Sequence, residues 1–101
     1  MYDYILDAQG NPVQAADTMQ WAQFMEAGNR IVARDELPGG VTVSTVFLGI
    51  DHNFTGEGAP ILWETMVFGR DNDMQTRYTS REDAEQGHAD IVATVKAEVC
   101  G

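Results

Sequence analysis

The side chains of greatest chemical interest in this sequence are two histidines and two carboxylates: Asp51, His52, Glu64 and His88. A histidine beside a carboxylate can act in general acid–base catalysis or bind a divalent metal. His52 directly follows one apolar segment and Glu64 lies in the middle of the next, so the register of the two segments decides whether they meet. We therefore treat His52, Glu64 and His88 as candidate catalytic residues. For His88, which falls on the apolar face of a predicted helix, the alternative is a hydrogen-bonded residue of the core.

The segment that begins at Asp51 resembles the start of a calcium-binding loop. Oxygen-bearing side chains stand at its first, third and fifth positions and a glycine at its sixth: Asp51, Asn53, Thr55 and Gly56. A calcium loop of this kind also needs a bidentate glutamate at the twelfth position, and that position is Leu62. We interpret the segment as a polar turn whose side chains satisfy nearby backbone groups, and we predict no metal and no cofactor.

A second set of candidates surrounds the polar turn after residue 69. Arg70, Arg77 and Tyr78 flank three acidic or amide residues. Arginines beside acids usually form solvated ion pairs that add little stability. The alternative is a pocket for a carboxylate or a phosphate.

Two tryptophans, Trp21 and Trp63, are candidate anchors for a protein partner, because tryptophan is enriched at the energetic centres of interfaces. Side chains alternate along a strand, so Trp63 and Glu64 lie on opposite faces. An open face that carries Trp63 would favour self-association or partner binding. The candidate binding residues are therefore Asp51, His52, Trp63, Glu64, Arg70, Arg77 and Tyr78.

Apolar periodicity and turn residues predict the elements that position these side chains. Near the N-terminus, a short strand at residues 2–6 and a partner at Val13–Gln14 form a small hairpin. A helix is expected over Thr18–Ala27, because Asp17 is a typical N-cap residue and a Gly-Asn pair follows the segment.

The rest of the chain alternates between strand and turn patterns before a second helix. Strands are predicted within residues 30–37, 41–50 and 61–69, and a short one at Arg77–Tyr78. The second helix is expected over Arg81–Val99, directly after a Ser-x-x-Asp capping box.

This order of elements, hairpin-α-β-β-β-α, favours the α+β class. We expect two layers: a mostly antiparallel sheet of three to five strands, with two helices packed on one face. The length of 101 residues predicts one domain over residues 1–101.

Composition narrows the function classes. Sixteen acidic and six basic residues give a net charge of -10, whereas direct nucleic-acid binding requires clustered lysine and arginine. The single cysteine, Cys100, excludes an internal disulfide and a multi-cysteine metal site. No apolar run is long enough to span a membrane and no secretory signal is visible, so we expect a cytoplasmic protein.

Four stretches of the sequence resemble a group of small uncharacterised proteins of bacteriophages and prophages. They are the segments 44–54 and 60–69, followed by the pairs Arg77-Tyr78 and Gly87-His88. The resemblance covers about Arg30 to His88 and implies an accessory protein in the cytoplasm of a bacterial host. The resemblance identifies no catalytic residue in this sequence.

These observations leave three functions open. We favour a non-enzymatic interaction module that binds a protein partner, such as a host or defence factor, or a second copy of itself. The first alternative is a small enzyme, or a metal- or ligand-binding protein, that uses the histidines and carboxylates. The second is an inhibitor that mimics the acidic surface of DNA.

Overall fold

The structure of the chain, a computed structural model, describes residues 3–69 and 74–100. The described helices and strands are β1 (Tyr4–Leu6), β2 (Pro12–Gln14), α1 (Thr18–Ala27), β3 (Ile31–Leu37), β4 (Val41–Phe47), β5 (Trp63–Phe68), β6 (Gln75–Tyr78) and α2 (Arg81–Cys100). Arg70, one of the predicted binding residues, and the side chain of Cys100 lie outside the described part.

Strands β3 to β6 form one antiparallel sheet in which each strand pairs with its neighbour in the sequence. Strand β4 shows strict alternation: Val41, Val43 and Phe47 are buried, while Thr42 and Ser44 between them are half-buried. β-branched residues fit this half-buried, pleated surface well. The alternation therefore divides the sheet into an apolar face and a mixed face.

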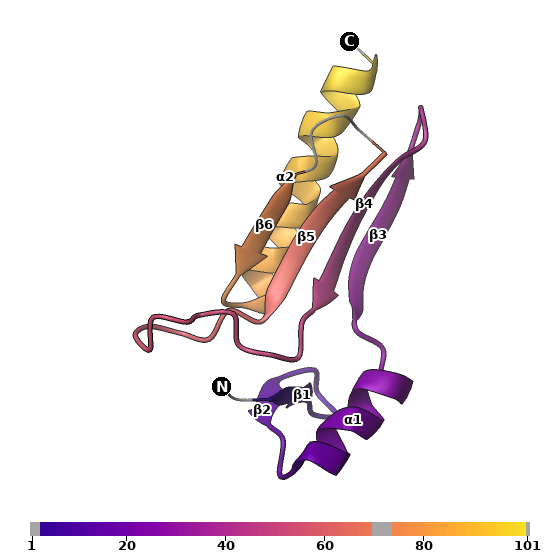
Figure 1. Cartoon of the computed structure of the whole chain (residues 1–101). Coiled ribbons are helices and arrows are strands. Elements are labelled where there is room, and N and C mark those ends of the chain that lie inside the picture. The colour runs from indigo at the N-terminus through magenta and orange to yellow at the C-terminus, as the bar shows by residue number, and fades with distance from the viewer. Residues whose placement is uncertain (1–2, 70–73, 101) are drawn as a thin grey trace.

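Helix α2 lies along the apolar face and contacts all four strands (Figure 1). Ala84, His88, Ile91 and Val95 follow helical spacing and are buried. The backbone N–H of Asp83 donates to the hydroxyl of Ser80 at 3.0 Å, which confirms the predicted N-cap.

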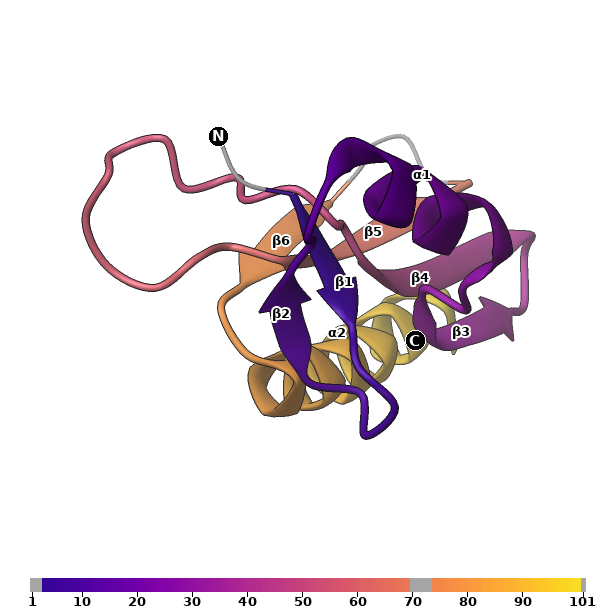
Figure 2. The same ribbon diagram turned by 90° about the horizontal axis from the view of Figure 1, so that it is seen from below.

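The hairpin β1–β2 and helix α1 lie together at one end of the sheet (Figures 1 and 2). Helix α1 begins after Asp17, whose carboxylate accepts the backbone N–H of Gln20 as an N-cap should. From α1, the indole Nε1 of Trp21 donates to the carbonyl of Gly49 at 2.9 Å, and the ring of Phe24 meets Phe47 edge-on, with centroids 6.0 Å apart. These contacts attach the N-terminal segment to the end of the sheet.

The predicted α+β class is confirmed by two antiparallel sheets with a helix packed on the larger one. The position of the first helix differs from the expected arrangement, because α1 does not lie along the apolar face beside α2. It contacts β1 and, through Phe24, reaches only Phe47 at the end of that face. The short row of apolar side chains on α1 covers only the end of the sheet. No helix among residues 3–69 and 74–100 is long and apolar enough to cross a membrane.

Gly87 permits the closest contact between α2 and β6. A Cβ at this position would overlap the hydroxyl of Tyr78. We predict that Gly87→Ala lowers the free energy of unfolding by about 1–3 kcal/mol, as overpacking does, although alanine favours a helix by about 1 kcal/mol over glycine. Urea denaturation followed by circular dichroism measures this change.

The matched control is Ala89→Gly, at an exposed position of the same helix. It should lower the free energy of unfolding by about 1 kcal/mol through propensity alone. A Gly87→Ala variant more stable than the wild type would contradict the close contact.

Candidate functional site

The face of the four-stranded sheet opposite α2 is left uncovered by the described elements (Figure 1). Four apolar side chains lie on it, brought together by the strand register: Ile31, Val46, Met66 and Phe68. Ile31 pairs with Val46 across β3 and β4, and its residue is 52% exposed. Phe68, at the other end of β5, is 47% exposed. We call these four residues the apolar stripe.

Charged and amide side chains flank the apolar stripe on both sides. On the β6 side, Glu64 accepts hydrogen bonds on Oε2 from Arg77 Nε at 2.9 Å and from Gln75 Nε2 at 2.5 Å. On the β3 side, Arg34 and Glu36 form an exposed ion pair at 3.5 Å. Each arginine thus has an acidic partner on the same face, so this face is close to electrically neutral in a strongly acidic protein.

The opposite face holds a chain of polar groups between the sheet and α2. His88 Nδ1 lies 2.7 Å from the hydroxyl of Thr45, and Nε2 lies 2.7 Å from the carboxylate of Asp35. The hydroxyls of Thr45 and Thr65 are 2.5 Å apart, and Tyr78 donates to Thr65 at 3.1 Å. Thr45 and Thr65 are fully buried. Buried polar groups are stable only when hydrogen-bonded, and this series of hydrogen bonds gives each of these side chains a partner.

The structure does not bring the candidate catalytic residues to one point. Glu64 lies on the open face of the sheet, and His88 lies under the other face. His52 lies beyond the end of β4, where its Nδ1 contacts the carbonyl of Ile50 at 2.8 Å. In the described part of the chain, no three His, Cys, Asp or Glu side chains could hold a metal ion together. The shared acid–base site that the sequence left open as an alternative therefore does not form.

Neither tryptophan is an exposed anchor. Trp63 is 2% exposed, beneath the sheet on the α2 side, with its ring 5.6 Å from that of Phe47. Trp21 is half-buried and bonded to the end of the sheet. The exposed large apolar side chains of the four-stranded sheet are instead Ile31 and Phe68. Sequence reasoning missed them, although the alternation that places Trp63 inward also places Phe68 outward.

The pocket considered as the alternative for Arg70, Arg77 and Tyr78 is not formed by Arg77 and Tyr78, and Arg70 lies outside the described residues. Arg77 turns to Glu64 on the open face, and the hydroxyl of Tyr78 turns to Thr65 on the other. Adjacent strand residues point in opposite directions, so these two side chains cannot line one pocket.

The loop between β4 and β5 confirms the polar-turn interpretation. Asp51 Oδ1 accepts the backbone N–H groups of Asn53 at 2.7 Å and Ile61 at 2.9 Å. Asn53 Nδ2 donates to the carbonyls of Glu57 and Ala59. Local side-chain hydrogen bonds therefore give this loop a defined shape, and it extends well away from the sheet (Figure 2).

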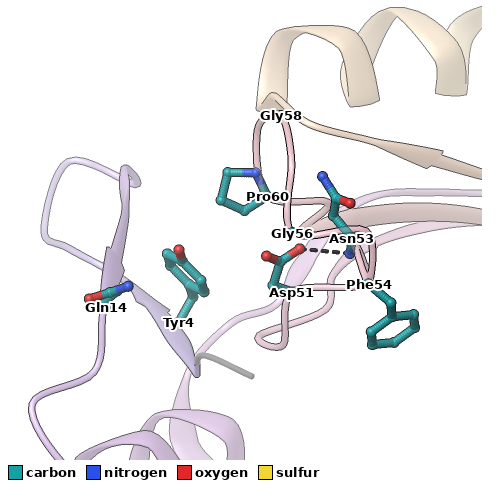
Figure 3. A pocket seen from close by; sticks show the side chains of 8 residues that line it. All are labelled: Tyr4, Gln14, Asp51, Asn53, Phe54, Gly56, Gly58 and Pro60. Carbon is teal, nitrogen blue, oxygen red and sulfur yellow. Dashed lines mark hydrogen bonds between the residues drawn. The ribbon is translucent and has the colours of Figure 1, made fainter.

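A cavity of about 500 Å³ lies between this loop and the β1–β2 hairpin (Figure 3). Its walls include Tyr4 and Gln14 from the hairpin and Asp51, Asn53 and Pro60 from the loop. Its volume is within the range of small-ligand pockets. Of the predicted binding residues that the structure describes, Asp51 alone lines it.

Comparison of the chain with protein-family models, with curated proteins and with solved structures finds no match. The resemblance to small phage proteins stays a prediction. Function is therefore inferred from the geometry and charge of the chain's own residues.

The hydrogen-bonded position of His88 predicts a structural role. We expect His88→Ala to lower the free energy of unfolding by about 2–4 kcal/mol, because it opens a cavity and leaves the Thr45 hydroxyl without one of its two hydrogen-bond partners. The control His52→Ala, in the loop, should change it by less than about 1 kcal/mol. Urea denaturation of both variants measures the difference, and equal losses would contradict the assignment.

Proposed function

We propose that this protein is a small acidic accessory protein of the phage type that acts as a non-enzymatic interaction module. In this proposal, the open face of the four-stranded sheet binds a basic protein of the bacterial host, in the cytoplasm. The observation that supports it is the apolar stripe of Ile31, Val46, Met66 and Phe68 on a face that no described element covers.

The composition of this face is typical of a protein–protein interface. An apolar centre is flanked by charged and amide groups, as in interfaces with a dry core and a polar rim. The flanking charges of Arg77 and Glu64 already neutralise each other, so a partner need not supply a counter-charge at each of them. The strands hold the stripe in place, which limits the conformational entropy lost on binding.

The size of the face predicts transient binding. Four strands at about 4.8 Å spacing, with an average length of about 20 Å, present roughly 400 Å². A standard stable interface covers about 800 Å² on each partner. The stripe would then be the centre of a weak interface, or of a larger one that reaches neighbouring residues.

Charge supports a basic partner over a second copy. The net charge of -10 attracts a basic protein at long range and repels another copy of the same chain. Added salt should weaken binding to a basic partner, because it screens the attraction. It should strengthen binding between two copies of this chain, because it screens their repulsion.

The two alternative functions have less support. An enzyme or metal protein built on the histidines requires side chains that the fold keeps apart. A DNA mimic requires a continuous acidic stripe, whereas exposed acids such as Asp17, Glu36, Glu57 and Glu82 lie on four separate segments. No observed feature favours either over the open sheet face.

The proposal predicts that the double variant Ile31→Ser with Phe68→Ser loses the partner. Proteins retained by the immobilised wild type from infected and uninfected bacterial lysates are identified, purified and titrated by calorimetry. We expect a basic protein whose affinity falls at least about tenfold for the double variant, because two anchors of the interface centre are removed. Its affinity should also fall as salt increases.

The matched control is Val13→Ser with Met19→Ser, which removes two exposed apolar side chains from the N-terminal segment. Binding by this control should equal that of the wild type. The proposal fails if both double variants bind equally. It also fails if sedimentation shows a dimer that strengthens with salt and is lost only in the sheet-face variant, because the face is then a self-association surface.

A further inference from the structure

The cavity between the β1–β2 hairpin and the β4–β5 loop is a second surface of different chemistry. It is built from the hairpin and from a loop that extends beyond the end of the four-stranded sheet (Figures 1 and 2), and the residues of the apolar stripe do not line it. It therefore does not depend on the function proposed above. Its volume of about 500 Å³ would hold a small organic group or one long side chain.

An aromatic ring and a carboxylate face each other across this cavity. Figure 3 shows Tyr4 projecting from β1 toward Pro60 and Asp51, which belong to the loop on the other side. Phe54 points away from Tyr4 and is 71% exposed. Tyr4, Pro60 and Asp51 are thus the lining side chains that face one another.

The carboxylate of Asp51 is held in position and keeps one oxygen available. Both hydrogen bonds that it accepts from described residues, from the N–H groups of Asn53 and Ile61, go to Oδ1. The other oxygen is directed toward the side of Tyr4 (Figure 3). The backbone N–H groups of the loop therefore fix the carboxylate of Asp51. The carboxylate can still accept further hydrogen bonds.

The charge of the lining excludes most ligand classes. Among residues 3–69 and 74–100, no lysine or arginine lines the cavity, and its acidic side chain is Asp51. An anion would therefore meet repulsion and no positive partner from these residues. A bare metal ion would find one carboxylate where it needs several oxygen ligands. An organic cation fits, because an aromatic face and a carboxylate both attract positive charge, and the net charge of -10 raises the local concentration of cations.

We propose that this cavity binds an organic cation, namely an ammonium or guanidinium group on an apolar stem. The cation pairs with the free oxygen of Asp51 and lies against the ring of Tyr4, while the stem contacts Pro60. Gln14 lines the cavity on the hairpin side. This chemistry occurs in the lysine or arginine side chain of a protein and in a free amine.

The test titrates the full chain with butylammonium, followed by backbone amide signals in NMR at constant ionic strength. Butanol and butyrate are the neutral and anionic probes. We expect saturable shifts at Tyr4, Asn53 and Ile61 with butylammonium, with a Kd on the order of millimolar for so small a ligand. Butanol and butyrate should give no saturation in the same range. Butanol binding as tightly as butylammonium would overturn the proposal.

Three variants locate the site. Asp51→Asn removes the charge but keeps an oxygen that can accept from Asn53 and Ile61, and it should weaken binding at least about fivefold. Glu57→Gln removes the same charge from an exposed position of the same loop and should leave binding unchanged. Equal losses in both would show a general charge effect and overturn the proposal. If Asp51→Asn disturbs the loop, Tyr4→Leu tests the ring separately.

Two further measurements complete the design. A blocked lysine peptide that binds more tightly than butylammonium identifies a protein side chain as the ligand, and the reverse order identifies a free amine. The Ile31→Ser and Phe68→Ser double variant should bind butylammonium like the wild type. Failure of the cation site and failure of the sheet-face proposal are thus distinguishable.

Discussion

The packing of α2 across four strands is the constraint on which the rest of the structure depends. One helix can cover one face of a sheet, and the apolar side of α2 takes the inward side chains of β4 and β5. Because side chains alternate along a strand, burying Trp63 and Val67 forces Glu64, Met66 and Phe68 to the opposite face. The exposed apolar stripe is therefore a direct consequence of how the core is built.

Polar groups inside this packing specify how α2 lies on the sheet. His88 meets Thr45 on one side and Asp35 on the other, and a shift of the helix would leave buried groups without partners, at a cost of about 1–3 kcal/mol each. Gly87 adds a steric condition, since only a residue without a Cβ accommodates Tyr78 there. A triad of threonine, histidine and aspartate resembles catalytic geometry, but Thr45 is fully buried and no substrate can reach it.

The N-terminal segment closes the end of the sheet and creates the second surface. Trp21 attaches α1 to Gly49, and the hairpin then lies opposite the β4–β5 loop, with the cavity between them. The two surfaces differ in physical character. The sheet face is apolar with paired charges, whereas the cavity joins an aromatic ring to a carboxylate that retains a free oxygen. An acidic protein with both would recognise apolar and cationic features through separate sites.

Local patterns in the sequence were sufficient to predict the α+β class, the strand alternation, the N-caps of both helices and the polar turn at Asp51, because each depends on residues close in the chain. Which face of the sheet α2 covers was decided only by the tertiary structure. Strand β5 carries large apolar residues on both faces, so periodicity cannot say whether Trp63 or Phe68 is buried. The partners of His88 could not be predicted either, since Asp35 and Thr45 lie 53 and 43 residues away in the sequence. Contacts over such separations depend on how the sheet and α2 pack, which no local pattern encodes.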